Sequence, residues 1–131
     1  MSESTEQQAL IYWFRLQYPD KIIYANANAA WFGGIERGRR AAYGALRKRE
    51  GLLAGVSDLF IPESKHYGGC RELIARGLFL EMKDVKKTQC SVTPAQKQFL
   101  EDMRARGYEA HVAFGFEQAK VIIEYYMEGV I

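Results

Sequence analysis

The stretches GVSDLFIP at residues 55–62 and GLFLEMK at residues 77–83 decide the fold of this chain. Both are mostly apolar, as buried strands are, and Pro62 ends the first because proline cannot continue a paired strand. In the second stretch Glu81 and Lys83 alternate with apolar residues, so both project to the same side of the strand. The sequence therefore predicts two neighbouring buried strands that carry charged side chains.

Asp58, Glu81 and Lys83 are the candidate catalytic residues of this strand pair. A buried carboxylate is costly unless a cation or hydrogen bonds compensate its charge. If the strands pair as a hairpin, both carboxylates converge on one hard divalent cation, and Mg²⁺ typically takes one or two carboxylates with several waters. Lys83 could activate a water or stabilise charge on a phosphate. A structural ion pair is the alternative for either acid alone, but the pattern D-(22 residues)-E-x-K as a whole favours a metal site.

Local signals predict the remaining elements. Residues 4–17 have the apolar spacing of an amphipathic helix, which Ser4 or Thr5 would cap and Pro19 would end. The others are a short strand at 21–27, a basic helix at 36–50, a loop with at most one helical turn at 63–76, a helix from Thr93 to about Arg106, a strand at 108–115 and an amphipathic helix at 116–129. This order indicates an α/β domain around a small mixed sheet.

Two further polar side chains occupy predicted helix starts. Thr93, Pro94 and Gln96 follow the order of a capping box with proline at the first helical position. Glu6 shares a helix face with Leu10, one turn away, and an acid in the first turn of a helix interacts favourably with the helix dipole.

Length and composition limit the class of protein. We expect a single domain over residues 1–131, and 48% hydrophobic with 13% aromatic residues exclude intrinsic disorder. No apolar run approaches the roughly 20 residues that span a bilayer, so no membrane partner is expected. The polar, acidic N-terminal segment is unlike a signal or transit peptide, and two cysteines do not suggest a disulfide framework, which together predict a cytoplasmic location.

The net charge of +2 is unevenly distributed along the chain. Positions 37–49 hold six Lys or Arg residues, which could track a phosphate backbone or simply form a solvated basic face. Other basic residues are expected to flank the proposed site and could clamp a DNA backbone. The DNA-binding candidates are Arg39, Arg40, Arg47 and Lys48 in the basic helix, and Arg71, Arg76, Lys86 and Lys87 beside the strands.

The motifs in this order resemble the VRR-NUC family, a branch of the PD-(D/E)xK nucleases. The resemblance is carried by GLLAGVSDLFIP at 51–62, GLFLEMKD at 77–84 and SVTPAQKQFLEDMRARGYEAHVAFGFEQAKVIIEYY at 91–126. It covers about residues 50–127 and extends weakly over the N-terminal helix and the NANA segment at 26–29. ExK alone is weak evidence, whereas the two strands, the TPAQ helix start and the GY turn in sequence are strong evidence.

The resemblance implies a restriction-endonuclease-like core and a phosphodiesterase that depends on Mg²⁺ or Mn²⁺. It implies that Asp58 and Glu81 are metal ligands, that the backbone carbonyl of Met82 also reaches the metal, and that Lys83 is the catalytic lysine. Stand-alone, phage-type members look like homodimeric endonucleases acting on branched DNA such as Holliday junctions. The expected setting is therefore a bacterial or phage-infected host cell.

Two further residues match family positions, and two features depart from the family. Gln96 matches the helix glutamine, which implies a site role that can coexist with its capping role. Glu6 matches the acid often present in the first helix, which makes it a candidate metal ligand, with the interaction with its own helix dipole as the alternative. Ser57 stands where the family motif has proline, and CRELIAR at 70–76 separates two segments that the family often joins directly. These departures affect the expected strand entry and the expected loop geometry.

Two expectations concern function and assembly. The alternative to a nuclease is a non-catalytic protein that binds or structures DNA junctions, although the complete Asp58–Glu81–Lys83 set argues against it. A homodimer is expected because the last helix and C-terminus carry more apolar residues than a monomer should expose, namely Tyr125, Met127, Val130 and Ile131.

Overall fold

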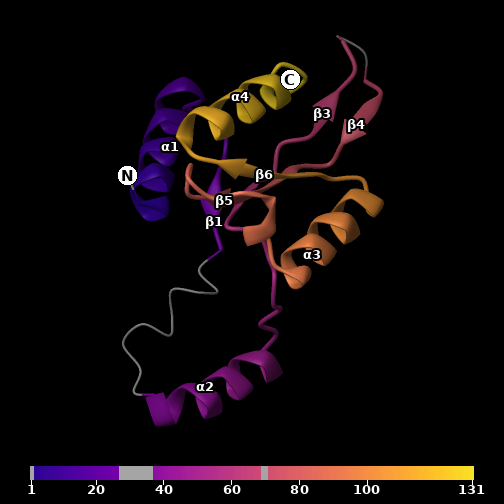
Figure 1. Cartoon of the computed structure of the whole chain (residues 1–131). Coiled ribbons are helices and arrows are strands. Elements are labelled where there is room, and N and C mark those ends of the chain that lie inside the picture. The colour runs from indigo at the N-terminus through magenta and orange to yellow at the C-terminus, as the bar shows by residue number, and fades with distance from the viewer. Residues whose placement is uncertain (1, 27–36, 69–70) are drawn as a thin grey trace.

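The computed structural model describes residues 2–26, 37–68 and 71–131 (Figure 1). Its centre is a four-stranded sheet in the order β1–β2–β5–β6, formed by β1 (Tyr24–Ala25), β2 (Leu59–Ile61), β5 (Leu78–Lys83) and β6 (Glu109–Phe114). The first three strands pair antiparallel, whereas β5 and β6 run parallel. The predicted α/β class, with a small mixed sheet flanked by helices, is confirmed.

Helices cover both faces of the sheet. The helices α1 (Glu3–Gln17) and α4 (Phe116–Met127) pack together on one face, and α3 (Pro94–Ala105) lies on the other (Figure 1). On the α1 and α4 side, Leu80 and Met82 of β5 are buried in the main core with Leu10 and Phe14 of α1.

The opposite side of β5 is aromatic near its start and charged near its end. Phe79 stacks on Phe60 of β2 with ring centroids 4.3 Å apart and meets Phe99 of α3 edge-on at 5.2 Å. Because side chains alternate along a strand, Glu81 and Lys83 share this side with Phe79. The strand pattern in the sequence thus places both charged groups beneath the start of α3.

The helix starts follow the expected chemistry with one correction. The capping box between Thr93 and Gln96 is present at the start of α3. At α1 the cap is Ser2, whose hydroxyl accepts from the Thr5 N–H at 3.2 Å, instead of the predicted Ser4 or Thr5. The helix therefore begins one residue before the predicted range, because a serine three residues ahead of Thr5 already satisfies its amide.

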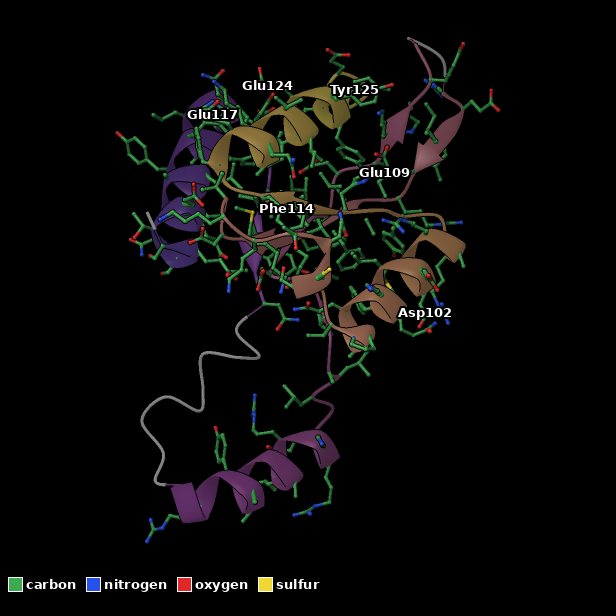
Figure 2. The ribbon with its side chains drawn as sticks, in the orientation of Figure 1. Asp102, Glu109, Phe114, Glu117, Glu124 and Tyr125 are labelled. Carbon is green, nitrogen blue, oxygen red and sulfur yellow. The ribbon has the colours of Figure 1, made fainter. Side chains whose placement is uncertain are left out.

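A hairpin replaces the loop that was predicted at 63–76. Strands β3 (Lys65–His66) and β4 (Leu73–Ala75) pair antiparallel. Lys65 anchors the hairpin to the body of the protein: its ammonium lies 3.5 Å from Glu109 and 4.3 Å from the centre of the Tyr125 ring. Figure 2 shows Glu109 on β6 and Tyr125 on α4 facing this hairpin. These long-range contacts stabilise a pairing that the local sequence does not indicate.

The predicted basic helix is present as α2 (Arg37–Arg49), and it lies apart from the sheet (Figure 1). None of its described side chains is buried. The turn that follows it contains Gly51, which has a φ of 110°, and the Leu52 N–H donates back to the Arg47 carbonyl at 2.8 Å. This glycine-based cap turns the chain towards β2.

The C-terminal apolar residues are less exposed than the dimer expectation assumed. Met127 is buried, and Val130 is half-buried where it pairs with Lys65 of the hairpin. Tyr125 and Ile131 remain exposed. Only two of the four apolar residues on which the homodimer expectation rests, Tyr125 and Ile131, are therefore exposed.

No helix in the described part of the chain combines the length and the apolar character needed to cross a membrane.

Candidate active site

The pairing of β2 with β5 brings Asp58 and Glu81 together. In the register of the two strands Leu59 lies opposite Leu80, so Asp58, one residue before β2, falls next to Glu81 and Met82. Asp58 Oδ2 accepts a hydrogen bond from the Met82 N–H at 2.8 Å. The carboxylate is therefore held at the end of the sheet by the backbone of the neighbouring strand.

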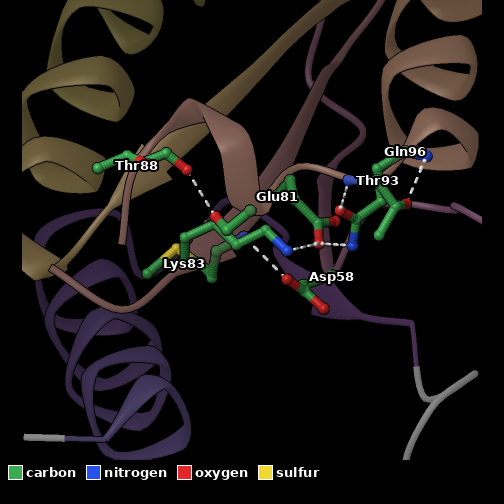
Figure 3. A network of polar contacts seen from close by, with 8 residues as sticks. Asp58, Glu81, Lys83, Thr88, Thr93 and Gln96 are labelled. Atoms are coloured by element: carbon green, nitrogen blue, oxygen red, sulfur yellow. Dashed lines mark hydrogen bonds and ion pairs between the residues drawn. The ribbon is translucent and has the colours of Figure 1, made fainter. Parts of the chain in front are cut away.

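Glu81 is the most enclosed acid of the site, with 3% of its surface exposed. Its Oε1 accepts from Gln96 Nε2 at 2.6 Å and lies 4.0 Å from Lys83 Nζ (Figure 3). Its Oε2 is buried and has no hydrogen-bond partner among the described residues. A buried carboxylate oxygen without a donor is costly, which makes this oxygen a natural ligand for a cation.

The pKa values of Asp58 and Glu81 also indicate that this pair of carboxylates lacks sufficient compensating positive charge among the described residues. Burial, reinforced by the negative charge of Asp58, raises the pKa of Glu81 to about 8, although Lys83 opposes the shift. Burial also raises the pKa of Asp58, against the lowering effects of the Met82 N–H and of Lys83. Two carboxylates thus share a site in which the protein supplies too little positive charge for both to ionise.

The donor set fits a hard divalent cation. Among the described residues no cluster of three or more His, Cys, Asp or Glu side chains has metal-binding geometry. Two carboxylates with open positions for water suit Mg²⁺, whereas a structural zinc site needs four protein ligands. The unpartnered Glu81 Oε2 and the raised pKa values of both acids are the features that a cation would relieve.

A cavity of about 320 Å³ opens beside the two carboxylates. One wall is the apolar segment 52–56, and the other is the first turn of α3 with Thr93 and Gln96. Gly55, which has a φ of 88°, lies so close to the carbonyl of Ala95 that a Cβ atom would overlap it. The segment that leads from α2 to β2 is therefore packed directly against the start of α3.

Glu6, a predicted metal ligand, contacts the start of α4 through one of its two carboxylate oxygens. It is buried on α1, and its Oε1 accepts from the Phe116 N–H at 3.4 Å. Its negative charge therefore lies at the N-terminus of α4, where a helix dipole favours an acid. Its Oε2, like that of Glu81, is buried without a hydrogen-bond partner among the described residues. Its Oε1 therefore meets the dipole of a different helix from the one the sequence suggested.

Glu3, which no sequence pattern singled out, is an α1 acid whose charge is coupled to the charges of the site. Burial and then the charge of Asp58 raise the pKa of Glu3, while Lys83 and Lys87 lower it. Both Glu3 and Glu6 lie in the first turn of α1. No local signal separates them, because the choice depends on how the helix packs across the sheet.

The four predicted DNA-binding residues outside α2 divide between the two ends of β5. Lys86 and Lys87 follow β5 at the carboxylate end, and both are exposed. Arg71 and Arg76 precede β5 at the hairpin end, so the expectation that they flank the site is not met. Five residues of extended chain separate Arg76 from Glu81, which is roughly 16 Å.

The basic residues of α2 are exposed or partly exposed. Arg39 and Lys48 face solvent, and Arg47 forms an ion pair with Glu50 at 3.4 Å. The side chain of Arg40 lies outside the described residues.

The two departures from the family pattern have different positions. Ser57, beside Asp58, is 2% exposed, and its hydroxyl has no partner among the described residues. The described part of the 70–76 segment contributes β4 at the end of β5 that is distant from the carboxylates. This part of the segment therefore lies at the hairpin end of the sheet, away from the carboxylates.

Comparison with solved structures identifies the fold. A structure described as "VRR_NUC domain protein" superposes with a TM-score of 0.72 at 24% sequence identity, over 99% of this chain and 91% of that chain. No family model matches the sequence. No curated protein matches it either. The expected likeness to VRR-NUC domains is confirmed at the level of the fold.

Proposed function

We propose that this protein is a Mg²⁺- or Mn²⁺-dependent DNA endonuclease that hydrolyses phosphodiester bonds. The observation that carries the proposal is the pair of buried carboxylates, Asp58 and Glu81, held next to Lys83 and Gln96 in a VRR_NUC fold. Such a pair is unfavourable without a cation, and its donor atoms are those that Mg²⁺ prefers.

Each residue then has a role that follows from its position. Asp58 and Glu81 would hold the metal, which when bound supplies Lewis acidity and lowers the pKa of water. The Met82 N–H faces Asp58, and because backbone groups of one strand residue point to the same side, the Met82 carbonyl also faces the metal side. Lys83, with 12% of its side chain exposed, would place its positive charge beside the scissile phosphate. Glu3 would add negative charge near the site.

Replacing Lys83 with alanine should lower the rate of cleavage by roughly 10²–10³-fold, because a charge directed at the transition state is lost. The Mn²⁺ affinity, measured by calorimetry, should fall much less. Removing Lys83 raises the pKa of Glu81 further, so a proton competes with the metal for Glu81 at neutral pH. The small loss of Mn²⁺ affinity should therefore be smaller at pH 8.5. Equal losses in affinity and rate would instead assign Lys83 a structural role.

The cleavage assay that tests the proposal compares labelled duplex, flap, splayed and four-way DNA with Mg²⁺ and with EDTA. We propose that branched DNA, such as a Holliday junction, is the preferred substrate. Symmetric cleavage of a junction requires two sites, so a homodimer is part of this proposal. Binding of junction DNA without Mg²⁺-dependent cleavage would support the alternative of a non-catalytic junction-binding protein.

The affinity for DNA should depend on the basic face of α2. Replacing Arg39 and Lys48 together with glutamine is expected to reduce the slope of log K against log salt by up to about 2, because each lost phosphate contact releases one counterion fewer. The matched control replaces Arg71 and Arg76, which lie at the opposite end of β5. An equal change of slope in both double variants would contradict a specific role for α2.

A further inference from the structure

At the start of α3, Thr93 is linked to Glu81 through the side chain of Gln96. We propose that Thr93 is a positioning residue, which holds the side-chain amide of Gln96 so that its NH₂ group, and not its oxygen, faces Glu81. The inference rests on the proposed function in one respect, since Glu81 would be the ligand that is positioned.

Three hydrogen bonds carry the inference (Figure 3). The Thr93 N–H donates to Gln96 Oε1 at 2.9 Å, and the Gln96 N–H donates to Thr93 Oγ1 at 3.1 Å. Gln96 Nε2 then donates to Glu81 Oε1 at 2.6 Å. The capping box of the helix and the bond to the carboxylate therefore use the same glutamine side chain.

The orientation of that side chain follows from its donors and acceptors. A glutamine amide has one oxygen that accepts and one NH₂ group that donates. A flipped amide would place its NH₂ group against the Thr93 N–H and its oxygen against the Glu81 carboxylate, which loses both bonds and adds two repulsive contacts. Because the Thr93 N–H occupies Oε1, Gln96 acts on Glu81 as a donor and does not act as a metal ligand.

The surroundings prevent the helix start from shifting. Pro94 occupies the first helical position, and Gly55 packs against the carbonyl of Ala95 from the other side of the cavity. The φ of Thr93 is −70°. The backbone of the turn therefore fixes the Thr93 N–H, and this N–H in turn fixes the orientation of the Gln96 amide that donates to Glu81.

The consequence concerns the two oxygens of Glu81. Oε1 faces the amide of Gln96 and the ammonium of Lys83, whereas Oε2 is buried without a partner among the described residues. Holding Oε1 in this way leaves Oε2 as the oxygen directed to the cation. Outer-shell groups that orient a metal ligand typically contribute 10–100-fold to metal affinity or activity.

Three substitutions at position 93 separate the contributions. Thr93→Ser keeps both the hydroxyl and the N–H. Thr93→Val removes the hydroxyl alone. Thr93→Pro also removes the N–H, and proline suits the φ of this residue. We expect the Mn²⁺ affinity, measured by calorimetry, to fall by less than about 2-fold in Thr93→Ser, by about 3-fold in Thr93→Val and by roughly 10-fold or more in Thr93→Pro.

A second measurement reports the amide itself and needs neither metal nor DNA. In metal-free, ¹⁵N-labelled protein the Gln96 NH₂ protons should be protected from hydrogen exchange in the wild type and in Thr93→Ser. They should exchange like a free glutamine in Thr93→Pro.

The matched control is Gln118→Ala, which removes an equivalent side-chain bond at the start of α4, where Gln118 Oε1 accepts from the Phe114 N–H at 2.7 Å. It should lower thermal stability while leaving Mn²⁺ affinity within 2-fold. Equal Mn²⁺ affinities for the valine and proline variants, or an equal loss in Gln118→Ala, would overturn the inference. If the wild type neither binds Mn²⁺ nor cleaves DNA, the proposed function fails, and the exchange of the Gln96 amide alone still decides the positioning role.

Discussion

Replacing Glu81 with glutamine is expected to lower the rate of DNA cleavage by roughly 10³-fold or more, as measured on the preferred substrate with Mg²⁺. The substitution exchanges a charged ligand for a neutral amide and adds an NH₂ group beside the existing donors Gln96 and Lys83. Asp58→Asn should have a similar effect on the rate. Asparagine is the appropriate change there, because its oxygen can still accept from the Met82 N–H, which alanine would leave unsatisfied.

Glu109→Gln is the matched control for these variants. Glu109 is a partly buried acid on the same sheet that pairs with Lys65 and His111, and it begins β6 opposite the start of β5. Its substitution should leave cleavage within about 2-fold of wild type while weakening the attachment of the hairpin. Retention of more than about a tenth of the wild-type activity by Glu81→Gln would refute the assignment of Glu81 as a metal ligand.

The metal-free protein is expected to be more stable at pH 5.5 than at pH 8.5. The pKa of Glu81 is raised from its ordinary value to about 8, so between about pH 4.5 and pH 8 the folded state binds more protons than the unfolded state. The free energy of unfolding therefore falls as the pH rises through this window. The raised pKa of Asp58 acts in the same direction, whereas the lowered pKa of Glu109 acts below about pH 4.5.

The expected difference is on the order of 2–4 kcal/mol, or roughly 5–15 °C in melting temperature. Thermal unfolding with and without metal measures it. Saturating Mg²⁺ or Mn²⁺ should restore stability at pH 8.5 and have little effect at pH 5.5, where protons already neutralise the pair. Glu81→Gln should flatten the pH profile and remove most of the metal effect. A wild-type melting temperature that rises from pH 5.5 to pH 8.5 without metal would contradict the prediction.

Much of the fold follows from local patterns in the sequence. The alternation in LFLEMK predicted that Glu81 and Lys83 share one side of a strand, and the structure places them 4.0 Å apart. The TPAQ segment predicted a capped helix start, and both bonds of the capping box are present. These features depend on backbone periodicity and on contacts between residues that are three or fewer positions apart, so neighbouring residues contain all the information they need.

Other predictions failed because they required knowledge of distant partners. The 63–76 segment forms a hairpin since Lys65 meets Glu109 and Tyr125, which come much later in the chain. Met127 was predicted to be exposed, yet the packing of α4 against the core buries it.

The candidate site shows the same division most clearly. The sequence by itself determined which residues are candidates, namely Asp58, Glu81, Lys83 and Gln96, because charged residues in apolar strands, a capped helix start and a family motif can all be read without the fold. Only the tertiary structure decided how they combine: the register of β2 on β5 joins Asp58 to the Met82 N–H, and the packing of α1 couples the charge of Glu3 to Asp58 and Lys83. Register and helix rotation are set by burial of apolar faces across the whole sheet, and no short segment contains that information.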